Sequence, residues 1–123
     1  MKICITARGQ DMNSEIDPRF GRCEYFLIID TETLDLEAVP NPNINSSGGA
    51  GIQSGQLIAS KDVKKVLTGN VGPNAFQTLQ AAGIEVITGV SGNIKQAVEK
   101  LNRGELRTAS GPSVVSKSGL PNK

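Results

Sequence analysis

The sequence predicts an α/β domain built on a five-stranded mixed sheet flanked by helices. Before residue 41, strand-like segments follow one another without a helix between them, which indicates an antiparallel meander. After residue 50, helix patterns alternate with short apolar strands, as is typical of parallel strands joined by crossovers. The length of 123 residues fits one hydrophobic core. We therefore expect a single domain over residues 1–106 and a flexible polar tail over residues 107–123.

The first part of the chain supplies the meander. The β-branched run Lys2–Ala7 predicts a strand, and the long polar loop Arg8–Arg22 follows it. Cys23–Asp30 contains an uninterrupted apolar stretch, as expected of a strand that is covered on both faces. A tight turn at Thr31–Thr33 leads to Leu34–Pro40, whose period-two alternation predicts a strand. The proline that ends this strand places it at an edge of the sheet.

The second part supplies helices and parallel strands in alternation. We expect a helix over Gly51–Lys61, a strand over Val63–Leu67 and a second helix over Gly72–Ala82. A strand over Ile84–Thr88 and a third helix over Asn93–Asn102 complete the domain. Two glycines directly follow helices and are suited to a left-handed stop: Gly83 and Gly104.

Three strand-to-helix junctions are rich in glycine and asparagine and carry no charged side chain. They are Asn41–Gln56, Thr68–Gln77 and Thr88–Ile94. The predicted strand directions bring all three to one edge of the sheet, together with the Arg8–Arg22 loop, and open α/β sheets bind ligands at such an edge. Backbone N–H groups and helix N-termini hold anions without a dedicated lysine. The junctions therefore predict an anion site that lacks groups for acid–base chemistry.

Three arginines of the first loop, Arg8, Arg19 and Arg22, are expected at the same edge. Arginine is weakly hydrated and offers several donors in a planar fork, which suits a large, diffuse anion. An alternative interpretation is that Asp17 begins a structural turn and pairs with one of these arginines. Both interpretations remain open at the level of sequence.

The two cysteines differ in their predicted surroundings. Cys4 alternates within the first strand and is expected to be a small core residue. Cys23 begins the second strand beside Arg22, where nearby cations would lower its pKa, and it is a speculative metal ligand. The alternative is that Cys23 is structural, since one thiol makes no metal site by itself.

Composition excludes several classes of function. The chain has no histidine, so catalytic triads and histidine–metal sites are absent. The formal net charge is +1, and three basic residues without an acid in 107–123 leave the rest of the chain mildly acidic, which argues against nucleic-acid binding. A magnesium nuclease would need clustered carboxylates, whereas the acids here are scattered. No segment approaches the roughly 18 apolar residues of a membrane span, and two cysteines without a signal peptide predict free thiols in the cytoplasm.

Several segments, in order, resemble the dinitrogenase iron–molybdenum cofactor biosynthesis family, whose members include nitrogenase accessory carriers and a carrier of a molybdenum–copper sulfide cluster. The matching segments are KICITA (2–7), DPRFGRCEYF (17–26), GGAG (48–51), TGNVGPNA (68–75), AGI (82–84) and TG (88–89). The resemblance covers about residues 1–106. It implies a ribonuclease-H-like motif and non-catalytic, non-covalent binding of an anionic metal–sulfur cluster.

Carried onto this chain, the resemblance implies a set of cluster-binding residues in the predicted loops: Arg19, Phe20, Gly21, Arg22, Gly48, Gly49, Ala50, Gly51, Gly69, Asn70, Val71, Gly72, Pro73 and Asn74. Residue chemistry alone adds Arg8 and Gly89 to this edge. Some relatives use a histidine to hold the nitrogenase cofactor, which this chain lacks. A molybdenum–copper sulfide cluster is therefore favoured over a related iron–molybdenum–sulfur cluster, with donor or acceptor proteins of cluster assembly as expected partners. The alternative is an interaction or regulatory module that binds a protein or a phosphorylated small molecule at the same edge.

Overall fold

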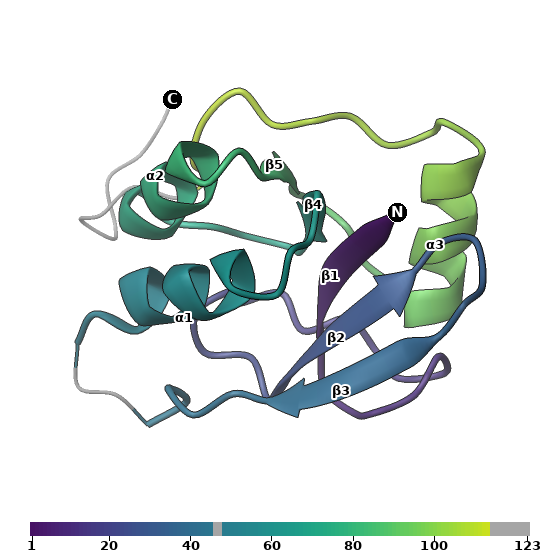
Figure 1. Ribbon diagram of the computed structural model, residues 1–123, viewed down its shortest axis with the longest axis horizontal. Helices are drawn as coiled ribbons and strands as arrows, with labels where there is room; N and C mark the ends of the chain where they lie inside the picture. Colours follow the sequence, from purple (N-terminus) through teal and green to yellow (C-terminus); the bar gives the residue numbers. More distant parts are fainter. Residues whose placement is uncertain (46–47, 114–123) are drawn as a thin grey trace.

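The computed structural model describes residues 1–45 and 48–113, and its sheet is the mixed five-stranded sheet that the sequence predicts. The strands lie in the order β3-β2-β1-β4-β5 (Figure 1). The elements, in chain order, are β1 (Lys2–Ala7), β2 (Tyr25–Asp30), β3 (Leu36–Pro40), α1 (Ala50–Ala59), β4 (Lys65–Leu67), α2 (Pro73–Ala81), β5 (Glu85–Ile87) and α3 (Ile94–Asn102). No helix among the described residues is long and apolar enough to cross a bilayer.

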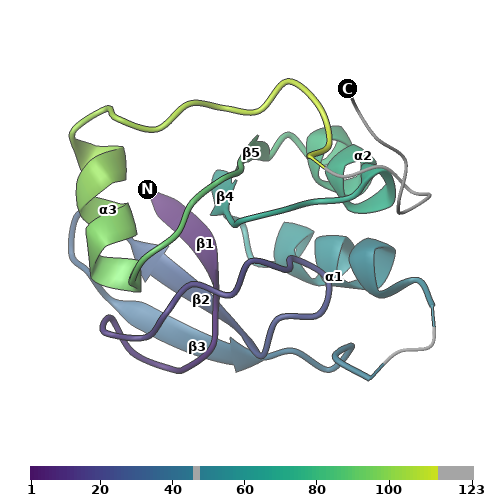
Figure 2. The same cartoon turned by 180° about the vertical axis from the view of Figure 1, so that it is seen from behind.

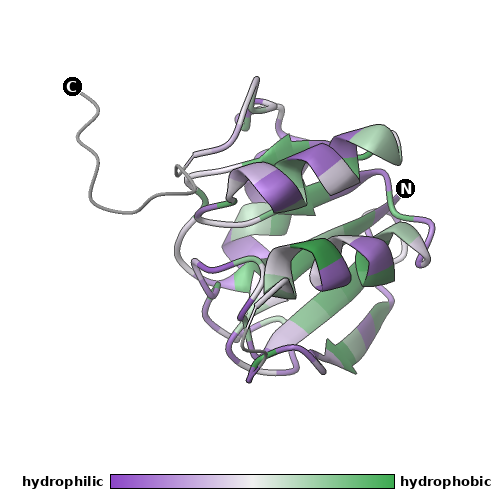
Figure 3. Cartoon of the chain, turned by 90° about the vertical axis from the view of Figure 1, so that its left-hand side faces the viewer, coloured by the Kyte–Doolittle hydropathy of each residue, from purple (hydrophilic) through white to green (hydrophobic). Residues whose placement is uncertain are grey.

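The helices cover both faces of the sheet. Figures 1 and 2 show α1 and α2 side by side on one face and α3 on the other. Side chains along β1 and β2 alternate between two buried clusters, because neighbouring residues of a strand point to opposite faces. Cys4 and Phe26 belong to the cluster under α1 and α2, whereas Ile5 and Leu27 belong to the cluster under α3. Figure 3 shows the hydrophobic strands lying behind α1 and α2. Both faces of β2 are thus covered, as its apolar run predicts.

The pairing directions bring four loops to one edge of the sheet. β2 is antiparallel to both β1 and β3, while β4 is parallel to both β1 and β5. The strands β1, β3, β4 and β5 therefore all end at the same edge, which we call the loop edge. The segments that leave it are residues 8–24, 41–49, 68–72 and 88–93. The convergence predicted from the sequence is confirmed.

Two strand boundaries differ from the predictions for identifiable reasons. β2 begins at Tyr25 rather than Cys23, because the Asn41 side-chain amide takes the Cys23 carbonyl as acceptor at 2.8 Å. β3 begins at Leu36 rather than Leu34, since Leu34 adopts a left-handed φ of 65° within a longer turn. The carboxylate of Asp30 stabilises that turn by accepting from the amides of the two residues that follow Thr31, at 2.8 and 3.2 Å.

Helices α1 and α2 approach closely because glycines of α1 face α2. A Cβ on Gly55 would lie 2.9 Å from Cγ2 of Thr78, and a Cβ on Gly51 would lie 3.2 Å from Cβ of Ala75. Small residues at this contact allow the two helices to pack directly against one another. Both helices start at the loop edge, so their N-termini lie next to each other.

The chain after α3 returns to the sheet. The amide of Ala109 donates to the carbonyl of Val86 at 2.7 Å, and the amide of Ser113 donates to the carbonyl of Val71 at 2.9 Å. The first residues of the predicted tail are therefore hydrogen-bonded to the domain. The remainder of that prediction, residues 114–123, lies outside the described residues.

Candidate anion site

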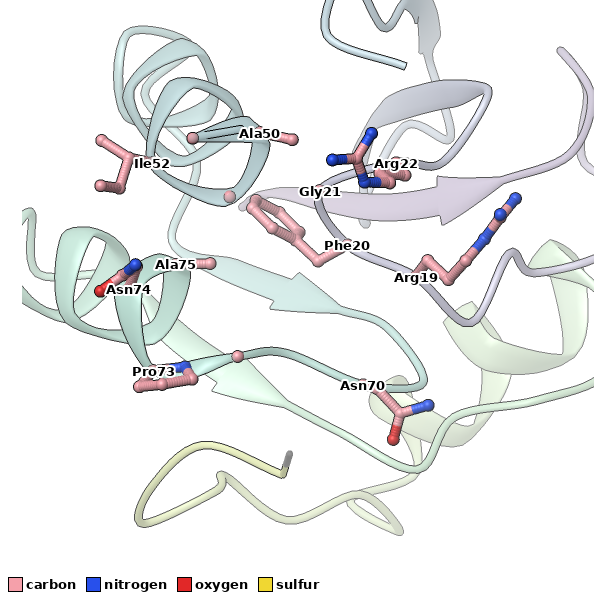
Figure 4. A pocket seen from close by; sticks show the side chains of 13 residues that line it. Arg19, Phe20, Gly21, Arg22, Ala50, Ile52, Asn70, Pro73, Asn74 and Ala75 are labelled. Atoms are coloured by element: carbon pink, nitrogen blue, oxygen red, sulfur yellow. The ribbon is translucent and has the colours of Figure 1, made fainter. Parts of the chain in front are cut away.

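A cavity of about 520 Å³ opens at the loop edge between the N-termini of α1 and α2 and the loop that follows β1 (Figure 4). Its lining residues are Arg19, Phe20, Gly21, Arg22, Gly49, Ala50, Gly51, Ile52, Asn70, Gly72, Pro73, Asn74 and Ala75. Most of the residues that the sequence assigns to the site are thus brought together.

Both helices present N-termini to this cavity that no described side chain caps. The first N–H groups of a helix have no partner within the helix. Neither the cap residue of α1, Gly49, nor that of α2, Gly72, supplies a side-chain hydrogen bond, and neither helix has an acidic residue in its first turn. By contrast, α3 is closed by a capping box between Asn93 and Gln96. The two helices at the cavity therefore direct their N–H groups and positive dipole ends toward an anion.

The loop after β1 is held against α1 and against the segment that leads into it. The Gly21 carbonyl accepts from Nδ2 of Asn41 at 3.0 Å and from Oγ of Ser54 at 3.2 Å. A Cβ on Gly21 would lie 3.1 Å from the amide nitrogen of Gly51, so only glycine fits there without movement. The Phe20 ring packs on that of Phe26, with centroids 5.6 Å apart, and anchors the loop in the core.

The two arginines of the cavity are in different electrostatic states. Arg19 forms an ion pair with the buried carboxylate of Asp17. The hydrogen bond between the two side chains raises the pKa of Arg19 above its ordinary value. Arg22 is exposed, and its Nη1 donates to the carbonyl of Ile44 at 3.4 Å. Among the described residues, Arg22 is thus the cavity arginine without a carboxylate partner. The pairing of Asp17 with one of the arginines, which the sequence left open, is observed.

Five of the predicted site residues do not line the cavity: Arg8, Gly48, Gly69, Val71 and Gly89. Arg8 pairs with Glu15, with Nε 4.0 Å from Oε1. Gly69 packs closely against the loop after β1: a Cβ on Gly69 would lie 2.7 Å from Cα of Pro18. The amide of Gly89 donates to the carbonyl of Gly69 at 2.8 Å and fixes that turn.

Cys23 is buried in the core cluster with an exposed fraction of 0%, and it does not line the cavity. Its pKa is raised, first by loss of hydration and then by the Asp17 carboxylate. Arg19 lowers the pKa of this thiol, as expected of a nearby cation, but burial and Asp17 outweigh it, so the net shift is upward and favours the protonated thiol. Cys4 is a core residue, as predicted. The described residues contain no group of three or more histidine, cysteine, aspartate or glutamate side chains placed to hold a metal ion.

Sequence reasoning missed two lining residues, Ile52 and Ala75, which occupy the third position of α1 and of α2. Both residues could have been predicted by including every side chain in the first turn of a helix whose N-terminus faces the site. Together with Phe20, Ala50 and Pro73 they make much of the lining apolar. Among the described residues, the lining offers N–H and guanidinium donors but no carboxylate, thiol or hydroxyl group. Apolar walls with N–H and guanidinium donors are suited to hold a weakly hydrated anion.

A substitution in the first turn of α2 is expected to change stability and anion binding in opposite directions. We expect Asn74→Asp, an exposed and nearly isosteric change, to raise the free energy of unfolding by about 0.3–1 kcal/mol, since a carboxylate complements the helix dipole. The same charge would face the cavity and weaken anion binding. Thermal unfolding and titration with tetrathiomolybdate test the two effects. Weaker binding with unchanged or lower stability would contradict the role given to this N-terminus.

The fold and the site together define a small mixed-sheet α/β protein with a cavity at the carboxyl ends of its parallel strands. The chain belongs to the dinitrogenase iron-molybdenum cofactor family, whose model matches residues 1–104. This confirms the family inferred from the motifs.

Solved and curated relatives agree with this membership. The apo form of the orange protein from Desulfovibrio gigas is 41% identical, with a TM-score of 0.88 over 91% of this chain and 95% of that one. A putative NifB protein from Thermotoga is 37% identical, with a TM-score of 0.76 over 87% of this chain and 91% of that one. An uncharacterized protein of Methanocaldococcus jannaschii is 31% identical over 97 residues, which are 76% of this chain and 82% of that one.

Proposed function

We propose that this protein binds and carries an anionic, molybdenum-containing metal–sulfur cluster without transforming it. The observation that carries the proposal is the convergence on one cavity of two helix N-termini and of Arg22, which has no carboxylate partner among the described residues. The family description, which names an iron-molybdenum cofactor, supports the choice of cargo. The cargo is held non-covalently and passed between donor and acceptor proteins.

The chemistry of the lining favours a sulfide cluster over a compact oxyanion. A strongly hydrated anion loses much hydration energy on entering a site with apolar walls, and it needs several strong donors in return. Here Phe20, Ile52 and Ala75 occupy part of the wall. The sulfur surface of a thiometallate is weakly hydrated, so dispersed N–H donors and one arginine suffice.

The lining also explains how a metal cluster can be held without protein ligands to the metal. The chain has no histidine, and both cysteine thiols are buried. In a molybdenum–copper sulfide the sulfides already complete the coordination of both metals. The protein then recognises the outer charge of the cluster rather than its metal ions.

Reconstitution tests this function. The protein, incubated with tetrathiomolybdate and a copper salt and passed through a desalting column, is expected to retain visible absorption and stoichiometric molybdenum. Ile52→Glu is the matched control, because it places a carboxylate at the exposed third position of α1, where the helix dipole favours it but an anionic cargo is repelled. Colourless, metal-free wild-type protein would contradict the proposal. Thermal stabilisation by phosphate compounds alone would favour the regulatory alternative.

A further inference from the structure

We propose that Asp17 sets the anion specificity of the cavity. By holding Arg19 in an ion pair, its carboxylate makes the site prefer thioanions over oxyanions. This inference rests on the proposed function of the same cavity and concerns a residue that does not line it.

The Asp17 carboxylate accepts three hydrogen bonds from Arg19. The Arg19 amide donates to Oδ1 at 3.0 Å, Nε donates to Oδ1 at 3.2 Å, and Nη2 donates to Oδ2 at 3.3 Å. The Asp17 side chain is 0% exposed, whereas the Arg19 side chain is 58% exposed. The partner that cannot move is therefore the carboxylate.

Asp17 is fixed to the central strand of the sheet. Its amide donates to the carbonyl of Thr6 at 3.0 Å, and its carbonyl accepts from Oγ1 of Thr6 at 2.6 Å. Oγ1 of Thr6 also lies 2.8 Å from Oγ1 of Thr68, at the end of β4. Arg19 must come to this carboxylate, and in Figure 4 its side chain extends away from the N-termini of α1 and α2.

The pair persists when the cavity is filled, because a buried carboxylate that loses its guanidinium partner is strongly destabilised. Arg19 consequently adds little net positive charge to the cavity. Guanidinium N–H groups bind oxygen anions more strongly than sulfur anions, since oxygen concentrates the negative charge. Because Arg19 stays paired with Asp17, its guanidinium group is not available in the cavity, and a guanidinium is the kind of donor that an oxyanion needs most.

Molybdate and tetrathiomolybdate test this directly, because both are tetrahedral dianions of the same metal. We expect wild-type protein to bind tetrathiomolybdate more tightly than molybdate. In Asp17→Asn, Arg19 is released, and molybdate affinity should rise about tenfold, the value of one added charge-assisted hydrogen bond. Tetrathiomolybdate affinity should change less, so the ratio of the two dissociation constants falls.

Glu15→Gln is the matched control. Glu15 lies in the same loop, has an exposed side chain, and its removal changes the net charge by the same amount. The affinity ratio should stay at the wild-type value in this variant. An equal fall in Glu15→Gln, or an unchanged ratio in Asp17→Asn, would overturn the inference while leaving the proposed function intact.

A measurement on wild-type protein covers the case in which Asp17→Asn does not fold. The Nε–H signal of Arg19 should exchange slowly with solvent both in free protein and at saturation with tetrathiomolybdate, because the pair with Asp17 is kept. Loss of that protection on binding would show that Arg19 transfers to the ligand and would overturn the inference. Wild-type protein that binds neither dianion would contradict both the inference and the proposed function.

Discussion

Arg22→Ala is expected to weaken tetrathiomolybdate binding by about ten- to a hundredfold, because a hydrogen bond to a charged partner contributes about 1.5–3 kcal/mol. Arg22 lines the cavity and has no carboxylate partner among the described residues, so its charge is available to a ligand. Its hydrogen bond to the carbonyl of Ile44 is long at 3.4 Å. The free energy of unfolding should therefore change by less than about 0.5 kcal/mol. Titration monitored by visible absorption measures the loss of affinity.

Arg8→Ala controls for the loss of one positive charge. Arg8 belongs to the same loop and is also exposed, but it does not line the cavity. Salt screens the contribution of an exposed charge that lies outside the cavity. Equal loss of affinity in the two variants would mean that Arg22 acts through net charge alone and would remove it from the site.

Gly69→Ala is expected to lower the free energy of unfolding by about 2–3 kcal/mol, the cost of forcing an extra group into a tightly packed position. The new Cβ would lie 2.7 Å from Cα and 3.0 Å from the carbonyl oxygen of Pro18, so backbone rather than a flexible side chain must move. The segment displaced is the one that carries Arg19 and donates from Phe20 to the Asn70 carbonyl at 3.3 Å. In a domain of this size such a loss corresponds to a fall in Tm of roughly 10 °C or more. Thermal unfolding followed by circular dichroism measures it.

Gly48→Ala is the matched control in the other glycine-rich junction. A Cβ on Gly48 meets nothing within 4 Å among the residues that the structure describes. Its stability should match that of wild-type protein. If Gly69→Ala were equally stable, the close contact with Pro18 would have no structural role.

The arrangement of the loop edge could be predicted because it depends on strand direction and connection alone. When an antiparallel meander is followed by two right-handed crossovers, only one arrangement of the strand ends is possible. Local chemistry then located both helix starts to within one residue: helices are expected from Gly51 and Gly72, and they begin at Ala50 and Pro73.

The behaviour of individual side chains could not be predicted, because it depends on contacts between segments far apart in the sequence. Asp17 is buried since Thr6, eleven positions earlier in the chain, binds its backbone on both sides. β2 begins later than predicted because the side-chain amide of Asn41 donates to the carbonyl of Cys23. The Cys23 thiol lies in the core rather than at the edge. Neither contact has a signature in local sequence.

The most direct test of the central claim, that two uncapped helix N-termini hold an anionic cluster, is amide-resolved NMR during titration with diamagnetic tetrathiomolybdate. We expect shifts concentrated on the first-turn amides of α1 and α2, namely those of Ala50, Gly51, Ile52, Asn74 and Ala75. The corresponding amides of α3, which the Asn93–Gln96 capping box already occupies, should remain unchanged. Binding that shifts α3 or other surfaces and leaves the α1 and α2 amides unmoved would contradict the account.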